Sequence, residues 1–239
     1  MYNKLRTQTI LWWNEIVWKW LREVWPLRQW ISRVWLIASY PLNGNATAEV
    51  WTNATATNIT RSSSQVWYFA QMGTFNWTNA FVLPPSNLVN NTNTFSVSAR
   101  CRRLWNATTW DGKVFDYRNA SSRNIYIANN NSPANMNFWV NFWTSFNHTI
   151  SEDFTNKRAH FVLSIEWWTC FIYRDWVLIT SWSCWTTTRT SSNGRIWNEW
   201  NAWASRFFNW NIALVKCYNR WLTSKEVQAL YLEWLSQLH

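Results

Sequence analysis

The sequence predicts an all-β protein built as an antiparallel sandwich of two sheets, with a short C-terminal helix and an N-terminal arm. Short apolar or alternating runs recur along the chain, each bounded by Asn, Ser, Thr, Asp or Pro. No helical pattern separates these runs, which excludes the alternating strands and helices of a parallel sheet. At 239 residues, the chain has the length of one large sandwich.

The predicted arm or linker covers residues 1–34 and the predicted sandwich domain covers residues 35–239. As written, the arm has a helical pattern that breaks at Pro26. If its tryptophans stand for glycine, a hypothesis developed below, helix propensity falls at each of those positions and a loose attachment segment is expected.

The strands are predicted to begin near Trp35. The first, in WLIASYPLNGNA, ends in a turn at Asn43-Gly44, a pair suited to the positive φ of tight turns. The later strands are VWYFAQ, NAFVLP, TFSVSARC, KVFDYR, SRNIYIAN, MNFWVNF, AHFVLSIE, TCFIYRD and WVLITS. Alternation along the strands predicts a core that includes Phe95, Val97, Ala99, Phe161, Leu163, Ile165, Ile172 and Val215.

The stretch after Phe207 predicts a strand, a turn and then a helix. Residues 212–218 form an apolar, partly β-branched run bounded by Asn on both sides. Thr223 and Glu226 then have the spacing of a capping box, which predicts a helix over residues 223–235. Its apolar positions follow at helical spacing and give it one face to lay on a sheet: Val227, Leu230, Tyr231 and position 234.

This ending, YNRWLTSKEVQALY, resembles that of the laminin G-like jelly rolls in the concanavalin A-like lectin/glucanase superfamily. LIASYPLNGNA, TFNWTNAFVLP, TFSVSAR and CFIYRDWVLITS look like the family's successive strands, so the resemblance covers residues 35–232. The chain departs from the pattern at Trp221, where the family usually has alanine or glycine, and at Ala213, where it often has aspartate. The resemblance implies a two-sheet jelly roll that presents a sheet face and rim loops to glycans or proteins.

Tryptophan is abnormally frequent: the chain has 25 Trp and 4 Gly. Asp175-Trp176 stands between FIY and VLIT, where a two-residue hairpin needs positive φ and Asp-Gly is the usual pair. Our hypothesis is that most of these tryptophans are glycines in the living source, because some bacterial lineages and their viruses read UGA as glycine. The alternative is a truly tryptophan-rich protein. The hypothesis predicts loops or turns at four positions, several of them with large solvent exposure: Trp77, Trp176, Trp185 and Trp210.

The formal charge of +10 arises from 22 basic and 12 acidic residues and favours anionic partners. The basic residues are spread out except for Arg100, Arg102 and Arg103, a cluster that we interpret as a strand end at the surface. Nucleic-acid binding is therefore not predicted. A run of 18 apolar residues and a signal leader are both absent from the sequence, so neither a membrane span nor standard export is predicted.

The four cysteines are Cys101, Cys170, Cys184 and Cys217. They have no CxxC spacing and no nearby histidine pair, so a zinc site is not predicted. Cys101 and Cys217 share the alternation of core residues and are expected to face the core from neighbouring strands. Disulfides and buried free thiols both remain open from the sequence.

The pattern of acidic residues and histidines argues against an enzyme. Glycosidases need two carboxylates across the sugar, but Glu152-Asp153 are adjacent and would point to opposite sides of a strand, and Glu166 and Asp175 stand alone. The isolated histidines are His148, His160 and His239, and a structural role is expected for His160. No nucleophile elbow, phosphate loop or dinucleotide fingerprint is present.

A candidate ligand-binding face lies in KVFDYRNASSRNIYIAN. Asp116 and Arg118 share one face of a strand, and Tyr126 offers a ring on which a sugar can stack; the alternative is an ordinary polar strand face. For calcium, Asp111, Asp116 and Asp175 are the plausible carboxylate donors, but such sites need several oxygen ligands together. We therefore predict neither a metal nor another cofactor.

These observations predict a non-enzymatic binding module for carbohydrate recognition or adhesion on a bacterial surface or a virion. The expected partner is a glycan or a surface protein, and an extracellular location is favoured although no signal peptide is visible. The alternatives are a glycoside hydrolase or lyase on the same fold and a purely structural surface or virion subunit. The function rests on analogy at the level of the fold.

Overall fold

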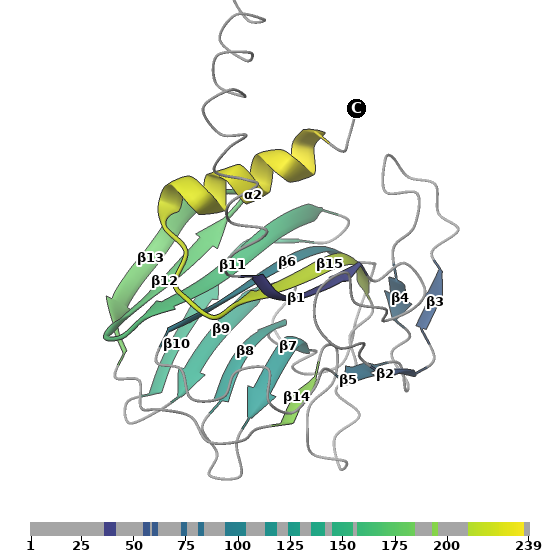
Figure 1. The fold of residues 1–239 in the computed structure, drawn as a ribbon, viewed down its shortest axis with the longest axis horizontal. Helices are drawn as coiled ribbons and strands as arrows, with labels where there is room; N and C mark the ends of the chain where they lie inside the picture. Colours follow the sequence, from purple (N-terminus) through teal and green to yellow (C-terminus); the bar gives the residue numbers. More distant parts are fainter. Residues whose placement is uncertain are drawn as a thin grey trace, which may run out of the picture.

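A computed structural model describes residues 36–41, 55–57, 59–61, 73–75, 81–83, 94–103, 113–118, 124–129, 135–141, 145–154, 157–184, 193–195 and 210–236. Over these residues the protein is an antiparallel jelly-roll sandwich of two packed sheets with a short C-terminal helix, which confirms the predicted fold class (Figure 1). Several predictions lie outside the described residues: those on the arm, the Asn43-Gly44 turn, the strand VWYFAQ, Trp77, Asp111, Trp185 and His239.

The larger sheet has eight strands. Its spatial order is β13 (Val177–Ser183), β12 (Thr169–Arg174), β11 (Arg158–Glu166), β6 (Phe95–Arg103), β15 (Trp210–Tyr218), β4 (Gly73–Phe75) and β3 (Ile59–Arg61), and β1 (Leu36–Pro41) also pairs with β15. All of these pairings are antiparallel. Strands far apart in sequence, such as β6 and β15, therefore lie side by side.

The smaller sheet has five strands, in the order β10 (Ser145–Ile150), β9 (Met136–Asn141), β8 (Asn124–Asn129), β7 (Lys113–Arg118) and β14 (Asn193–Arg195). A two-stranded ribbon pairs β2 (Thr55–Thr57) with β5 (Phe81–Leu83). The sequence did not predict β10, because the run SFNHTI has polar residues at most of its positions. It is an edge strand, whose outer side has no partner strand among the described residues.

The main core lies between the two sheets. The alternation in the sequence predicted it correctly, since all eight predicted core residues are buried in it. The aromatic rings of Phe95 and Phe115 (centroids 6.1 Å apart) and those of Phe138 and Phe161 (5.7 Å apart) join one sheet to the other. Burial of alternate residues on both sheets supplies the hydrophobic stabilisation of the sandwich.

The helix α2 (Ser224–Ser236) begins as predicted, with a capping box. The Glu226 backbone N–H donates to Thr223 Oγ1 over 3.3 Å, and the Thr223 N–H donates to Glu226 Oε2 over 2.8 Å. The apolar face of the helix buries Val227, Leu230 and Trp234. With residues of β11, β12 and β15, this face forms a second, smaller core on the outer side of the larger sheet (Figure 1).

The two turns that flank β12 have positive φ at residues other than glycine. In the β11–β12 turn Trp167 has φ 33°, and in the β12–β13 turn Asp175 and Trp176 have φ 47° and 70°. The prediction of a turn at Trp176 is therefore confirmed. The prediction of a turn at Trp210 is wrong, because β15 begins two residues before the apolar run and pairs Trp210 with Phe75 and Arg103.

Candidate functional site

The predicted ligand-binding residues lie on the smaller sheet. Asp116 of β7 is directly opposite Tyr126 of β8, and on its other side Asp116 is opposite Arg195 of β14. The same row continues across the sheet from Tyr126 to Trp139 of β9 and Asn147 of β10. The antiparallel register thus joins residues that are far apart in sequence into one row.

This row lies on the face turned away from the main core. Phe115 and Tyr117, the neighbours of Asp116 on β7, are part of the core, as are Ile125 and Ile127 beside Tyr126 on β8. Because successive side chains of a strand point to opposite faces, Asp116 and Tyr126 belong to the outer face of the sheet.

The outer face is nevertheless covered at these positions. Asp116 is 1% exposed and Tyr126 is 8% exposed, so Tyr126 is not an open platform on the protein surface. Arg118 ends β7, opposite Asn124 and Asn193. Ligand binding by Asp116, Arg118 and Tyr126 stays a prediction.

Asn137 of β9 is a further candidate that the sequence analysis missed. It is 5% exposed, and its side-chain oxygen is buried without a hydrogen-bond partner in the part of the chain that the structure describes. Its strand neighbours are Ala128 and Thr149. A buried oxygen without a partner costs about 1–3 kcal/mol, so a ligand hydroxyl that donates to it would be stabilised. The signal in the sequence was its alternation with Met136 and Phe138, which assigns it to the outer face.

The carboxylates considered for calcium do not come together. Asp175 Oδ1 accepts a hydrogen bond from the His160 backbone N–H over 2.9 Å, and Asp175 Oδ2 lies 3.3 Å from Arg174 Nε. Asp175 follows β12 of the larger sheet, whereas Asp116 lies on the smaller one. Within the described ranges, no group of three or more His, Cys, Asp or Glu residues is placed to hold a metal ion. None of the described helices is long and apolar enough to cross a membrane.

The described histidines have different surroundings. His160 is buried beneath α2, where its Nε2 lies 2.7 Å from Ser98 Oγ. Burial, together with the nearby charges of Arg100 and Lys216, lowers the pKa of His160 well below its usual range. His148 of β10 is partly exposed beside Phe146, and burial lowers its pKa. The Ser98–His160 pair has no access to solvent, which fits the expected structural role of His160.

The prediction that Arg100 lies at the surface is wrong. Arg100 is buried, and its Nη2 donates to the carbonyl oxygen of Leu230 on α2 over 2.9 Å. Arg102, two residues further along β6, is partly exposed. The basic cluster therefore ends a strand as predicted, but its first member faces the helix.

The four cysteines have two different states. Cys170 and Cys184 form a disulfide, which joins β12 to the end of β13. Cys101 and Cys217 are free and buried in the main core, as their alternation predicted. Burial raises the pKa of both free thiols, so neither is a reactive nucleophile.

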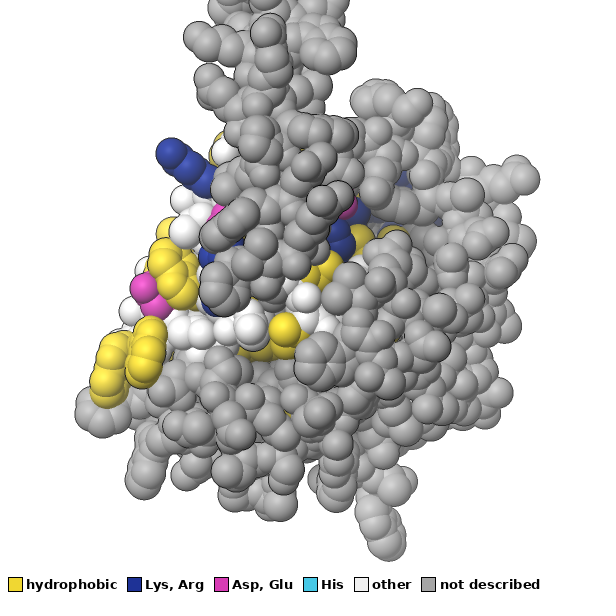
Figure 2. All heavy atoms as spheres, in the orientation of Figure 1, with side chains coloured by type: hydrophobic (Ala, Val, Ile, Leu, Met, Phe, Trp, Pro, Cys, Tyr) yellow, Lys and Arg dark blue, Asp and Glu magenta, His cyan; other side chains and the backbone are white. Residues whose placement is uncertain are grey.

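Exposed apolar side chains gather at the edge of the larger sheet, on the left of Figure 2, where Figure 1 places β13 and the β11–β12 turn. The tryptophans of the two turns are exposed: Trp167 by 56%, Trp168 by 54% and Trp176 by 45%. The first three residues of β13 are exposed as well: Val177, Leu178 and Ile179. Exposed apolar patches of this kind promote association of chains.

Comparisons with known proteins show the fold. No family model and no curated protein matches the chain. Domain 4 of AbnA, a GH43 extracellular arabinanase from Geobacillus stearothermophilus solved with arabinotriose, has a TM-score of 0.65 and 17% identity, covering 82% of this chain and 98% of that one. Trypanosoma rangeli sialidase in complex with sialic acid has a TM-score of 0.67 and 13% identity, covering 92% of this chain and 39% of that one.

The receptor-binding domain of botulinum neurotoxin mosaic serotype C/D gives a TM-score of 0.64 and 11% identity, covering 83% of this chain and 51% of that one. This chain therefore spans about half or less of the toxin and sialidase chains. At these identities the likeness shows the fold alone.

Proposed function

We propose that the chain is a non-enzymatic, laminin G-like jelly-roll module for carbohydrate recognition or adhesion on a bacterial surface or a virion. The observation that carries the proposal is the group of polar residues on the outer face of the smaller sheet, where Asp116 faces Tyr126 and the buried oxygen of Asn137 has no partner among the described residues. Two solved neighbours of this fold are complexes with arabinotriose and with sialic acid, and cell entry of a third, botulinum neurotoxin type C, depends on interaction with two ganglioside molecules. These neighbours support a glycan as the ligand.

The chemistry of this face suits a sugar. The carboxylate of Asp116 and the amide oxygen of Asn137 can accept hydrogen bonds from sugar hydroxyls. Among the described residues of the five strands, Asp116 is the one carboxylate on this face. Glycoside hydrolysis generally uses two carboxylates, about 5–9.5 Å apart, so a binding module is favoured over a hydrolase or lyase.

We expect Asn137→Ala to weaken glycan binding about tenfold, the effect of one lost hydrogen bond of about 1.4 kcal/mol, without lowering the melting temperature. The fold keeps its melting temperature because the oxygen removed has no partner in the described part of the chain. The measurement is a glycan array followed by titration of the strongest glycan. Asn219→Ala, at an exposed asparagine after β15, is the matched control.

Three results would contradict this proposal. Wild-type protein that binds no glycan on the array would favour a purely structural subunit. Release of new reducing ends from the bound glycan, measured in parallel, would favour the hydrolase or lyase. Equal losses in Asn137→Ala and Asn219→Ala would place binding elsewhere on the molecule.

We also propose that most of the tryptophans are glycines in the living source. Trp167 and Trp176 have positive φ, which costs an L-residue about 1–2 kcal/mol and glycine little. The rings of Trp182 and Phe146 have centroids 3.2 Å apart, closer than the usual range of about 4.5–7 Å. The Trp182 indole N–H is also buried without a hydrogen-bond partner in the described part of the chain. Glycine at these positions would relieve each of these features.

Trp176→Gly and Trp167→Gly are each expected to raise the free energy of unfolding by about 1 kcal/mol and to increase solubility. Trp168→Gly is the matched control: Trp168 is equally exposed, but it is not among the residues with positive φ. The Trp168→Gly substitution should improve solubility without raising the free energy of unfolding.

For protein from its natural source, mass spectrometry of the tryptic peptide that begins at Asp175 decides the identity of residue 176. Tryptophan found there would refute the recoding.

A further inference from the structure

A buried ionic layer holds α2 on the outer face of the larger sheet. Lys216 of β15 contacts both oxygens of the Glu233 carboxylate, at 3.1 and 3.0 Å, and Arg100 Nη2 lies 3.5 Å from Glu233 Oε2. The same Arg100 nitrogen donates to the Leu230 carbonyl oxygen over 2.9 Å. Two neighbouring strands thus bind the end of the helix through charges that are almost fully removed from water.

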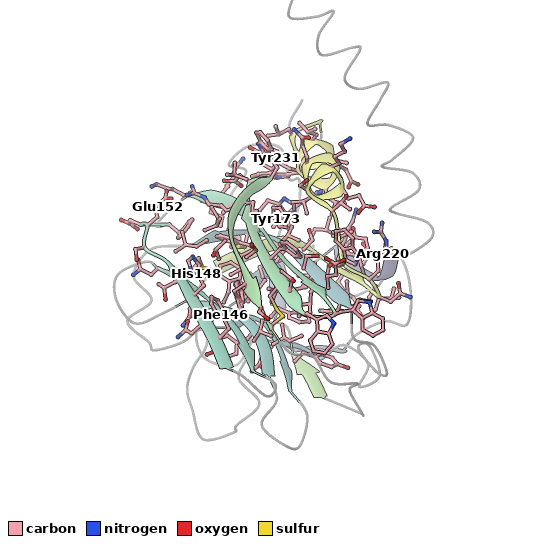
Figure 3. The ribbon with its side chains drawn as sticks, turned by 90° about the vertical axis from the view of Figure 1, so that its left-hand side faces the viewer. Phe146, His148, Glu152, Tyr173, Arg220 and Tyr231 are labelled. Carbon is pink, nitrogen blue, oxygen red and sulfur yellow. A yellow bond between two sulfur atoms is a disulfide. The ribbon has the colours of Figure 1, made fainter. Side chains whose placement is uncertain are left out.

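His160 of β11 lies in the same layer. Its ring stacks against that of Tyr231 on α2, with centroids 6.2 Å apart, and Figure 3 shows Tyr231 at the helix with Tyr173 on the sheet beneath it. His160 Nε2 bonds with Ser98 Oγ, while Nδ1 is buried without a partner among the described residues. The docked helix therefore encloses a histidine that has one ring nitrogen unsatisfied.

The groups that face this histidine disfavour a second proton on its ring. Burial lowers the pKa of His160 first, and the cations Arg100 and Lys216 on the adjoining strands lower it further. Asp175, which follows β12, contacts the backbone N–H of His160 and pairs with Arg174. On the helix, the facing groups are Tyr231, whose pKa burial raises, and Glu233, which already binds both cations. Protonation would add a third cation to this layer.

We propose that α2 is an acid-releasable cover, which leaves the outer face of the larger sheet when His160 gains a proton. The helix can leave without unfolding the sandwich because its apolar face packs in a core separate from the one between the sheets. Release would uncover Ser98 and His160 together with the apolar side chains of Val162 and Tyr173. This device is independent of the proposed glycan-binding face, which lies on the other sheet.

The pH dependence follows from linkage. The pKa of His160 is depressed while the helix is docked and rises toward its ordinary value of about 6.5 once the ring meets water. Docking is therefore at full strength above about pH 6.5, and its equilibrium constant falls about tenfold for each pH unit below that value until the docked pKa is reached. Asp175 acts in the opposite direction, because burial raises the pKa of its carboxyl and protonation then favours the folded state.

The test is hydrogen exchange of the full chain, followed by mass spectrometry between pH 7.5 and 5 and corrected for the intrinsic exchange rates. Peptides from α2 should lose protection by about tenfold per pH unit below about 6.5, whereas peptides from β6 and β11 keep theirs. In His160→Gln, which can still bond with Ser98 but cannot be charged, α2 should stay protected. His148→Gln, a partly buried histidine on the other sheet, is the matched control and should respond like the wild type.

The proposal is overturned if α2 is equally protected from exchange at pH 7.5 and pH 5. It is also overturned if the acid-dependent loss of protection in α2 persists in His160→Gln, or if α2 and β6 lose protection together. Should His160→Gln fail to fold, the pH dependence of α2 protection in the wild type still tests the proposal. Loss of protection that begins near pH 6.5 identifies a histidine as the group that titrates. Loss of protection that begins only below about pH 4.5 identifies carboxylates and refutes the proposal.

Discussion

Glu233→Gln is expected to lower the free energy of unfolding by about 3–5 kcal/mol at neutral pH, since it leaves Arg100 and Lys216 buried without the carboxylate that they share. A buried charge that loses its partner retains its desolvation penalty, which is larger than the value of most surface ion pairs. The measurement is urea denaturation followed by circular dichroism, with the change in midpoint converted through the m-value.

The control for this substitution is Glu166→Gln. Glu166 ends β11 and is partly exposed, so the same chemical change there should alter stability by less than about 0.5 kcal/mol. A loss below about 1 kcal/mol for Glu233→Gln would show that the ionic layer does not hold the helix.

Removal of the Cys170–Cys184 disulfide is the other large effect that we expect. The crosslink closes a segment with a sequence separation of 14. Constraint of the unfolded chain by a loop of this length is worth about 3 kcal/mol. It also ties the end of edge strand β13 to β12, the only strand that β13 pairs with among the described residues. Cys170→Ala/Cys184→Ala should therefore unfold at a lower urea concentration, and its β13 amides should exchange faster.

Dithiothreitol provides the matched comparison. It should lower the urea midpoint of the wild type to that of the double variant and leave the variant unchanged, because Cys101 and Cys217 have no disulfide to reduce. A wild type that dithiothreitol does not destabilise would contradict the prediction. A stabilising disulfide forms and persists in oxidising compartments, which supports the proposed extracellular location.

The candidate site was only partly predictable. Alternation along KVFDYR and NIYIAN placed Asp116 and Tyr126 on the outer faces of their strands, but it could not show that the two residues face each other or that both are buried. Asn137 was missed for the same reason. Whether a polar group on a strand has a partner depends on the neighbouring strands, and a single sequence does not specify which strands those are.

The sequence by itself determined the local elements of this protein. A period of two identified most of the longer strands and all eight predicted core positions, and the Thr223–Glu226 spacing identified the start of α2. The tertiary structure alone decided which cysteines are paired, that Arg100 binds the end of α2, and that His160 is enclosed with Ser98. The physical reason is range: alternation and capping depend on residues within one turn or strand, whereas these contacts join strands and a helix that only the order of the sheet brings together.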